Sequence, residues 1–462
     1  GGGAMAGAAG PDLTAVLQAA QSPDAGQRQA AEQQLEQLRQ ASPAGFLSSL
    51  AQELAGENRP VHTRQLAGLV LKNEFAAKTD ARRAELAQRW LQMDAGLRAQ
   101  IKAALLQTLH SPQAAAGRAS AQVIAEVASI EVPVKAWPDL VKTLHDNLLS
   151  AQGNTSLQLA TLDTLGYTCE ALVGMTALEQ QEVNLILTSV IQGMKKEDNK
   201  PIEVRMTATR ALLNAVDFAE KNFREHKNEQ QYMMQVVMEA AADPGDAMLR
   251  QVAFECLVAI SASYYDQLQD YLSHMFQLSC NAIKGDEEPV AMQAVEIWST
   301  IAEYELEAQE EIEAGNTDVK CLDITKQAAA YLIPVLLETL TRQEEGDDDD
   351  GAWNISMAGA VCLGNVAGAI GDEVVQHVWP FIQGSITRQE WQFRDAATLA
   401  LGYILDGPSE NTLSQSVVGS GLLAHLLQRM KEEPVVRVRE TTAWTLGRIC
   451  MLLHGAHMNG QV

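Results

Sequence analysis

A short pattern, Arg-x-x-Ala followed closely by Leu, Ile or Val, recurs along the 462-residue chain and constrains its fold more than any other feature. The pattern occurs at Arg28/Ala31, Arg64/Ala67, Arg118/Ala121, Arg205/Ala208, Arg250/Ala253 and Arg394/Ala397, with Thr replacing Ala at Arg439/Thr442. The gaps between these centres are filled by weaker matches centred on Gln158, Ala291 and Ser356. Most successive centres then lie about 40 to 47 residues apart, which indicates one structural unit repeated along the chain.

Each repeated unit is predicted to be a pair of helices. Apolar residues recur at helical spacing, as at Ala208, Ala211, Leu212 and Ala215, whereas the alternation typical of strands is nearly absent. A period of this length is typical of HEAT and armadillo helical repeats. We therefore predict an all-α fold, a HEAT-repeat superhelical solenoid of about ten helical hairpins with an extended concave surface.

The segments that precede the Arg-x-x-Ala centres also fit helices, with residues 139–149 and 267–278 as examples. A carboxylate stands four residues before three of the arginines, at Asp24, Asp246 and Glu390. Such a side chain can cap the helix that follows or pair with the arginine of a neighbouring repeat. We expect one of these two contacts at each of the three positions.

The length alone favours about three conventional domains, but a repeat array replaces them by one quasi-linear domain. We predict that this array covers residues 12–453. Residues 1–11 are predicted to be a flexible N-terminus that opens with a vector-derived GGGA, and residues 454–462 to be a truncated end, so that the chain is a fragment. The 65-residue gap between the centres at Ala291 and Ser356 predicts an insertion.

The chain is strongly acidic, with 59 Asp plus Glu against 34 Lys plus Arg and a formal net charge of −25. This charge argues against nucleic-acid binding, which rests mainly on contacts of Lys and Arg with phosphates. Residues 286–350 hold 19 acidic and 3 basic residues, which is −16 of the total. They include the run QEEGDDDDGAW and, on a predicted helix, the residues Glu303, Glu305, Glu307, Glu310, Glu311 and Glu313.

Two interpretations of this acidic stretch remain open. Like charges repel each other and stay solvated, so a solvated loop is the first. A basic protein partner is the second, because it would offset the self-repulsion of the four consecutive Asp residues that come just before Trp353. Calcium is a weaker rival, since the run lacks the alternating Asp spacing of an EF-hand loop.

No catalytic motif is evident in the sequence. It contains no Walker A motif, no GxGxxG after a strand and no GxSxG elbow. We therefore expect a protein that is not an enzyme, with no catalytic residue, no cofactor and no metal. Six cysteines without a CxxC pair indicate reduced thiols inside a cell, and the lack of any apolar stretch of about 18 residues predicts a soluble protein without membrane insertion.

Particular segments resemble the karyopherin-beta family of nuclear transport receptors. Residues 119–140 (ASAQVIAEVASIEVPVKAWPDL) resemble the family segment associated with binding of the Ran GTPase. The other matching segments are residues 66–73, 186–194, 209–218, 343–354 and 441–450. The resemblance runs in order from about residue 12 to residue 453 and covers roughly the N-terminal half of a receptor of this family.

The resemblance implies a binding site for GTP-bound Ran on second helices of the first few repeats and on the acidic stretch. The helix at residues 119–130 belongs to this site. The other matching residues are Lys72, Asn73, Trp137, Glu296, Glu303, Asp347, Asp348, Asp349 and Asp350. In the family a basic patch of Ran meets the acidic loop, which agrees with the basic partner expected from the charge.

The resemblance also implies that Phe-Gly repeats of nucleoporins bind the outer surface, between first helices. The matching residues are Leu187, Thr188, Ile191, Glu229, Tyr232, Met233 and Tyr271. Tyr232 and Met233 stand where the family pattern has Phe and Ile. Tyr and Met side chains still offer adaptable apolar contacts to a Phe ring, so we expect the site to be retained.

The import adaptor importin alpha is implied to bind acidic and Trp side chains on the inner surface, where basic groups can meet carboxylates and stack on indole rings. The matching residues are Trp353, Trp391 and Trp444, and core packing is the alternative interpretation of each. Much of this site belongs to repeats missing from the chain. We therefore expect importin alpha and basic cargo signals to bind weakly or not at all.

These implications divide the array into functional regions. Ran-binding repeats are expected at about residues 12–150, nucleoporin-binding repeats at about 150–285, acidic repeats at about 286–360 and further repeats up to 453. Binding of Ran-GTP is expected to release cargo through reciprocal coupling, in a receptor that shuttles between cytoplasm and nucleus and is enriched at the nuclear envelope. The alternative is a HEAT-repeat regulatory scaffold such as a phosphatase subunit.

Overall fold

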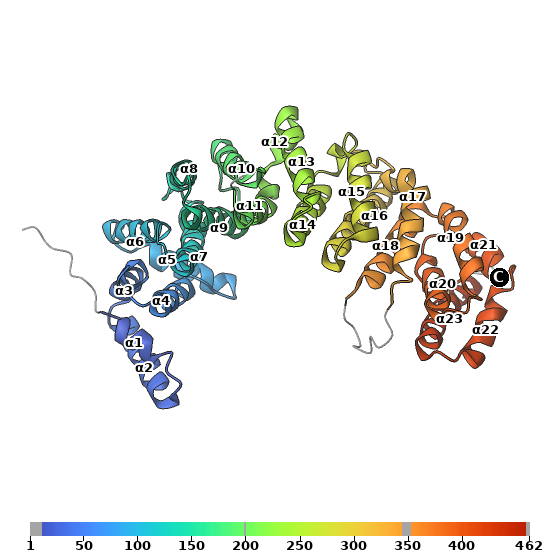
Figure 1. Ribbon diagram of the computed structural model, residues 1–462, viewed down its shortest axis with the longest axis horizontal. Helices are drawn as coiled ribbons and strands as arrows, with labels where there is room; N and C mark the ends of the chain where they lie inside the picture. Colours follow the sequence, from blue (N-terminus) through green and yellow to red (C-terminus); the bar gives the residue numbers. More distant parts are fainter. Residues whose placement is uncertain (1–11, 198–199, 344–352, 459–462) are drawn as a thin grey trace, which may run out of the picture. The chain divides into compact units, whose positions relative to one another are not determined.

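The computed structural model describes residues 12–197, 200–343 and 353–458, and helices make up nearly all of these ranges (Figure 1). The chain divides into two compact units, which meet in the sequence between Ala219 and Glu220. Within the described ranges, no helix is long and apolar enough to cross a membrane. The predicted all-α class is confirmed.

The first unit contains five helical hairpins and an additional helix, α5 (Asp80–Leu91). The hairpins are α1 (Thr14–Ala19) with α2 (Ala25–Ala41), α3 (Pro43–Ala55) with α4 (Val61–Asn73), α6 (Ala95–Thr108) with α7 (Ala114–Glu131), α8 (Leu140–Ser150) with α9 (Thr155–Leu172), and α10 (Gln180–Met194) with α11 (Ile202–Ala215). The short 3-10 turn η1 (Val216–Phe218) follows. The second helices α4, α7, α9 and α11 pack against one another in this order.

The second unit begins with α12 (Glu220–Arg224) and also contains five hairpins. These are α13 (Lys227–Ala241) with α14 (Ala247–Ser263), α15 (Leu272–Gly285) with α16 (Glu288–Glu313), α17 (Ile324–Thr339) with α18 (Ile355–Ile370), α19 (Glu373–Ser385) with α20 (Trp391–Ile404), and α22 (Leu422–Glu432) with α23 (Val436–Met458). The shorter elements are η2 (Tyr265–Gln267), α21 (Glu410–Leu413) and η3 (Ser414–Val418). The second helices α14, α16, α18, α20 and α23 pack in order, and the hairpins of the two units agree with the predicted number of about ten.

For two hairpins the sequence predicted the bounds of the first helix, and one of these predictions is more accurate than the other. Helix α8 covers residues 140–150, close to the predicted 139–149. Helix α15 begins at Leu272, five residues after the predicted start at 267. The residues before it form the 3-10 turn η2, which places the Tyr265 ring in the core, stacked on Tyr304 at 4.2 Å between ring centres.

The arginine of the repeated pattern joins the two helices of its hairpin. Arg64 Nε donates to the carbonyl oxygen of Leu54 at the end of α3 (2.8 Å), and Arg205 Nε donates to the end of α10 (3.1 Å). Carbonyl oxygens before the second helix accept equivalent bonds from Arg28, Arg250, Arg394 and Arg439. The end of a helix leaves carbonyl oxygens without partners, and the guanidinium satisfies them. Arg118 differs, because its side chain is 62% exposed and lies 3.6 Å from Asp163.

Two of the three carboxylates expected before the second helix act as caps. Asp24 accepts a hydrogen bond from the backbone N–H of Gln27 (2.8 Å), and Asp246 accepts one from that of Leu249 (2.7 Å). The prediction was wrong for Glu390. It directly precedes α20, but among the described residues its side chain makes neither a capping hydrogen bond nor an ion pair. Glu is not among the side chains that cap helices well, because the shorter Asp, Asn, Ser and Thr reach the first free N–H groups.

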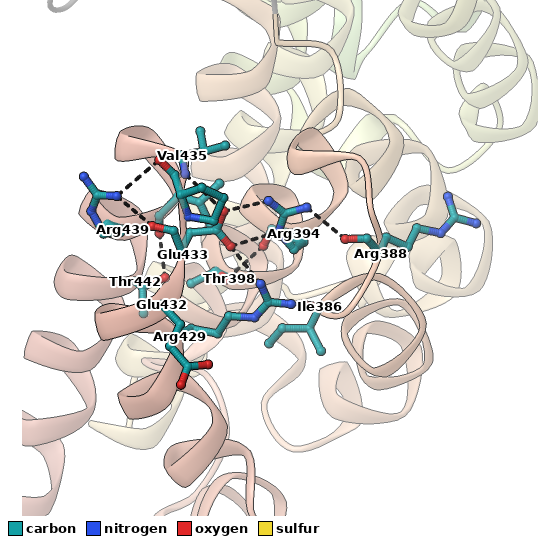
Figure 2. Close-up of polar contacts among 12 residues, drawn as sticks. Ile386, Arg388, Arg394, Thr398, Arg429, Glu432, Glu433, Val435, Arg439 and Thr442 are labelled. Atoms are coloured by element: carbon teal, nitrogen blue, oxygen red, sulfur yellow. Dashed lines mark hydrogen bonds and ion pairs between the residues drawn. The ribbon is translucent and has the colours of Figure 1, made fainter.

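Other carboxylates pair with the arginine of the preceding repeat. Asp286, just after α15, accepts hydrogen bonds from Arg250 of α14 on both of its oxygens, at 2.5 and 2.6 Å. Glu433, just after α22, accepts bonds from Arg394 of α20 at 2.6 and 2.9 Å (Figure 2). Each pair ties one hairpin to the next. Pairing with the arginine of a neighbouring repeat, one of the two contacts expected from the sequence, therefore occurs, but its acids are Asp286 and Glu433 and not Asp24, Asp246 or Glu390.

The 65-residue gap between two pattern centres contains a long helix and a long connection. Helix α16 has 26 residues, and residues 340–354 connect α17 to α18. Glu305 of α16, which the sequence argument counted with the acidic helix surface, is only 1% exposed. It accepts hydrogen bonds from the Tyr265 hydroxyl and from the backbone N–H groups of Ile324 and Thr325. Glu305 therefore caps the start of α17 and is inaccessible to a partner.

Candidate partner-binding surfaces

Lys72 and Asn73 lie at the C-terminal end of α4, next to the helix predicted from residues 119–130. That helix forms the middle of α7, and Lys72 Nζ lies 3.5 Å from Gln122 Oε1 on it. Asn73 is exposed and Lys72 is half-buried. The structure therefore brings these predicted Ran-binding residues together on two adjacent second helices of the first unit.

A pocket of about 600 Å³ opens beside Lys72, lined by residues of α4, α5, α7 and α9. Its charged and hydrogen-bonding side chains are Lys72, Arg83, Gln122, Glu126, Ser129, Tyr167 and Glu170. The sequence argument missed Arg83, Tyr167 and Glu170, because only the packing of α5 and α9 brings them next to α7. The one available signal was the spacing of Tyr167 and Glu170, which are three residues apart and share one face of a helix.

Trp137 is 4% exposed and packs under the ammonium group of Lys102, whose Nζ lies 4.7 Å from the centre of the indole ring. Lys102 and Arg98 both donate to Glu131, which is fully buried at the end of α7 and also accepts the indole N–H of Trp90 (3.0 Å). The cluster joins α5, α6 and α7. In this structure Trp137 is a packing residue, and its contact with Ran stays a prediction.

Glu296 and Glu303 are exposed on α16 in the second unit. Asn365 of α18 donates a hydrogen bond to Glu303 Oε1 (2.7 Å). Partial burial, followed by repulsion from Glu303, raises the pKa of Glu296. Among the described residues, neither carboxylate has a Lys, Arg or His nitrogen within 4.0 Å, so both retain their capacity to bind a cation of a partner.

The four aspartates Asp347, Asp348, Asp349 and Asp350 lie outside the described residues. The described residues on either side of them are anchored. Gln343 Nε2 donates to Asp395 Oδ2 on α20 (2.9 Å), and the backbone N–H of Ile355 donates to Glu288 Oε1 on α16 (2.8 Å). Burial raises the pKa of Asp395. The acidic run therefore leaves from and returns to the same unit that carries Glu296 and Glu303.

The predicted nucleoporin-binding residues on α10 differ in exposure. Thr188 is exposed, whereas Leu187 and Ile191 are 5% and 4% exposed. Their helical spacing places these two apolar side chains one turn apart on the buried face of α10. A partner that reaches this part of the first unit meets Thr188, while Leu187 and Ile191 support the helix from below.

The predicted nucleoporin-binding residues of the second unit lie on α13 and just before α15. Tyr232 is 40% exposed, and Glu229 is exposed and accepts a hydrogen bond from Asn222 Nδ2 (2.6 Å). Met233 is 4% exposed. Tyr271 is half-buried, with Lys227 Nζ 5.6 Å from the centre of its ring. Among these residues, Tyr232 offers the largest open apolar surface.

The three tryptophans matched to adaptor binding are all partly open, unlike the buried Trp90 and Trp298. Trp353 is 57% exposed, Trp391 at the start of α20 is half-buried and Trp444 on α23 is 39% exposed. The Trp444 ring packs on the backbone of α20, 5.1 Å from the Tyr403 ring. None of the three is completely buried, but Trp444 packs against α20, so core packing and adaptor binding both stay open as interpretations.

Known proteins with a similar sequence or structure match this chain over nearly its whole length. The importin-beta N-terminal domain family matches residues 31–111. Importin subunit beta-1 of Arabidopsis thaliana is 46% identical over 449 residues, which is 96% of this chain and 51% of that protein. The structure of yeast importin-beta (Kap95p) is 33% identical with a TM-score of 0.87, over 96% of this chain and 51% of that chain.

Two further similar structures contain Kap95p with a partner. One contains Kap95p with RanGDP and has a TM-score of 0.85, over 95% of this chain and 50% of that chain. The other is a complex of Kap95 with Nup1 and has a TM-score of 0.84, over 96% of this chain and 51% of that chain. Both are 33% identical to this chain.

The chain spans about half the length of these relatives, and the match lies in their N-terminal portion. The similarity confirms the predicted HEAT-repeat solenoid, and membership of a family of transport receptors confirms that the chain is not an enzyme. The repeat pattern, the helical packing and the extent of this similarity together show that the chain is a member of the importin-beta family, homologous to the N-terminal portion of importin subunit beta-1.

Proposed function

We propose that the chain is the part of a nuclear import receptor that binds GTP-loaded Ran and Phe-Gly nucleoporin repeats. The observation that carries this proposal is the similarity, over 95% and 96% of this chain, to Kap95p in structures with RanGDP and with Nup1. A HEAT-repeat regulatory scaffold such as a phosphatase subunit is the alternative. The identity of 46% with an importin subunit beta-1 favours the receptor.

The Ran site of the proposal has two parts. In the first unit, Lys72 and Asn73 stand at the end of α4 beside α7, and Trp137 follows α7 in the chain and packs against Lys102 of α6. In the second unit, Glu296 and Glu303 form an acidic surface without a neighbouring cation among the described residues. Asp347 to Asp350 add charge of the same sign. Such a field accelerates the association of a basic partner and selects it by sign.

Nucleoporin repeats are proposed to bind first helices through an apolar side chain. The exposed ring of Tyr232 on α13 supports this role, with Glu229 on the same helix and Tyr271 directly before α15 of the same unit. Thr188 on α10 provides an exposed contact in the first unit, above Leu187 and Ile191. Met233, which is buried, would support the Tyr232 site from within.

The adaptor importin alpha is proposed to use the open faces of Trp353, Trp391 and Trp444, with low affinity because the chain spans only about half of its relatives. Ran-GTP and cargo would then be coupled ligands of one array, so that binding of one releases the other. A receptor with these partners would shuttle between cytoplasm and nucleus and concentrate at the nuclear envelope. We propose this localisation together with the function.

The proposal is tested by measuring recovery of the chain on immobilised Ran loaded with GTP or with GDP. We expect the GTP form to recover more of the chain, because the proposed site discriminates between the two nucleotide states. Equal recovery of the chain on the two forms, or none on either, would overturn the transport function.

The role of the acidic run is tested by replacing Asp347, Asp348, Asp349 and Asp350 with Asn. We expect affinity for Ran-GTP to fall about tenfold at low ionic strength and to depend less on salt, because long-range attraction is lost. The matched control replaces Glu307, Glu310, Glu311 and Glu313 with Gln, which removes the same charge from an exposed part of α16. Equal affinity of both variants and the parent chain at all salt concentrations contradicts the assignment.

A further inference from the structure

The segment that leads from α17 toward the acidic run is held against α20 by a buried pair of polar side chains. Gln343, the last described residue of that segment, is 8% exposed, and Asp395 on α20 is 1% exposed. Gln343 Nε2 donates to Asp395 Oδ2 and to the carbonyl oxygen of Leu340, each at 2.9 Å. The amide nitrogen therefore uses both of its hydrogen atoms, and the pair lies within the second unit.

One oxygen of each of the two groups has no hydrogen-bond donor. Among the described residues, neither Gln343 Oε1 nor Asp395 Oδ1 has a partner, although both atoms are buried. Buried acceptors are normally satisfied, because burial without a partner costs free energy. The two atoms belong to the side chains that already share the Nε2–Oδ2 hydrogen bond. A single donor between them would therefore satisfy both.

The groups around Asp395 act on its charge in both directions. Burial raises the pKa of its carboxyl group, and the negative charge of Glu433 acts in the same direction. Thr441, Gln343 and Arg437 offset this effect only in part, and Arg437 Nε lies 3.8 Å from Asp395 Oδ2, beyond hydrogen-bond distance. Helices α18 and α19 also pack on α20, but none of their described residues is among the groups that act on Asp395.

A proton on Asp395 supplies the missing donor. A protonated carboxyl group has one O–H donor and still accepts a hydrogen bond at its other oxygen. With the proton on Oδ1, Asp395 would donate to Gln343 Oε1 while Oδ2 continues to accept from Nε2, so that acid and amide form a cyclic pair. Ionisation removes this donor and leaves two buried acceptors without a partner.

We propose that Asp395 and Gln343 form a proton-dependent latch, in which protonated Asp395 holds the segment after α17 to α20 through two hydrogen bonds and ionised Asp395 holds it through one. The inference is independent of the proposed partners. It makes the attachment of the chain at the start of the acidic run depend on the protonation of one buried carboxyl group. Asp286 is the opposite case, because the fold uses its negative charge to accept two hydrogen bonds from Arg250.

The variant Asp395→Asn tests the latch, because Asn has the same shape, carries no charge and offers Gln343 one donor and one acceptor at every pH. Since folding raises the pKa of Asp395, the parent chain loses stability relative to the variant as pH rises above the unfolded-state value of about 3.9. We expect backbone amides of residues 340–343 and of α20 to exchange hydrogen equally in the two chains near pH 4. At pH 7 they should exchange about threefold or more slowly in the variant.

The matched control is Asp286→Asn, which removes a carboxylate that is paired with a cation. Backbone amides of α14 and α16 should exchange faster in this variant than in the parent chain at pH 7. Comparison at the same pH cancels the intrinsic pH dependence of exchange. Faster exchange in Asp395→Asn at pH 7, or failure of this variant to fold, would show that the fold needs the charge of Asp395 and would overturn the latch.

Infrared spectroscopy tests the pairing itself. The difference spectrum between the parent chain and Asp395→Asn should contain the C=O band of a protonated carboxyl group, which disappears with a midpoint above about pH 3.9. In a Gln343→Leu background the same difference should show this band at higher frequency, because the acid carbonyl has lost its donor. A midpoint at or below about pH 3.9 would show that folding does not retain the proton, and an unchanged frequency would show that Gln343 is not its partner. Either result overturns the inference.

Discussion

Loss of the Arg394 guanidinium should destabilise the last two described hairpins more than loss of a comparable surface cation. The Arg394 side chain is 8% exposed and makes four hydrogen bonds (Figure 2). Two go to the carboxylate of Glu433, and two go to the carbonyl oxygens of Arg388 and Gln389, at 2.9 and 2.6 Å. The variant Arg394→Met removes all four while keeping much of the side-chain volume.

The size of the effect follows from what remains around Glu433. Its side chain is fully buried, and removal of one partner from a buried ion pair costs about 3 to 5 kcal/mol. Arg429 still donates to the carboxylate at 2.9 Å, which places Arg394→Met at the lower end, about 3 kcal/mol. Arg394→Lys keeps the charge but loses the fork geometry, and we expect it to cost about 1 to 2 kcal/mol.

Hydrogen exchange of backbone amides in α20 and α23 is the suitable assay, because repeat arrays open locally and a global unfolding free energy would average over all repeats. A loss of about 3 kcal/mol corresponds to exchange about 100-fold faster. The control is Lys326→Met, which removes an ion pair with Glu373 between α17 and α19. Both of those side chains are about half exposed, and such pairs are worth less than about 1 kcal/mol.

Equal acceleration of exchange by Arg394→Met and Lys326→Met would refute the reasoning, because burial would then make no difference. The double variant Arg394→Met/Glu433→Leu separates the two sources of the effect. It also removes the stranded carboxylate, so it should exchange more slowly than Arg394→Met alone. If the two variants exchange equally, the cost comes from the unsatisfied carbonyl oxygens and not from the buried charge.

Two further predictions concern contacts between neighbouring second helices and hairpins. Gly402→Ala should lower the unfolding midpoint, at a cost of about 1 to 3 kcal/mol, because the added Cβ would lie 2.2 Å from Cζ3 of Trp444. The control is Gly384→Ala, whose added Cβ would have no neighbouring atom within 4 Å, so it should be neutral or stabilising. The hydrogen bond from Arg250 lowers the pKa of Asp286, so its stabilisation is complete above the unfolded-state pKa of about 3.9 and is lost as pH falls through the lower folded-state value. Asp286→Asn should therefore be less stable at pH 7, and this difference should shrink below about pH 4 in denaturant titrations.

The repeated arginine shows why the fold could be predicted from the sequence. Each hairpin needs a donor for the carbonyl oxygens at the end of its first helix, and the same residue supplies it in most repeats, as Arg64 and Arg205 illustrate. The requirement is local to one hairpin. It therefore leaves a regular pattern in the sequence, and the period of that pattern identifies the architecture.

Contacts between repeats leave no such pattern. Glu131 collects donors from α5 and α6, and Glu305 caps α17 from α16, yet neither residue stands at a fixed distance from its partners in the sequence. The pocket beside Lys72 has the same origin, because Arg83 and Glu170 line one pocket only after the helices that carry them have packed. Family resemblance located Lys72 and the helix of Glu126, and packing supplied the rest.

The acidic stretch shows how far a charge count can go. The sequence places −16 between residues 286 and 350, but part of this charge serves the fold. Asp286 pairs with Arg250, and Glu305 is buried against the start of α17. The field that a partner meets from the described residues arises instead from exposed carboxylates such as Glu296 and Glu303. Selection for a basic partner therefore depends on which acids remain unpaired. The total charge of the segment is only an upper limit on the negative charge that a partner meets.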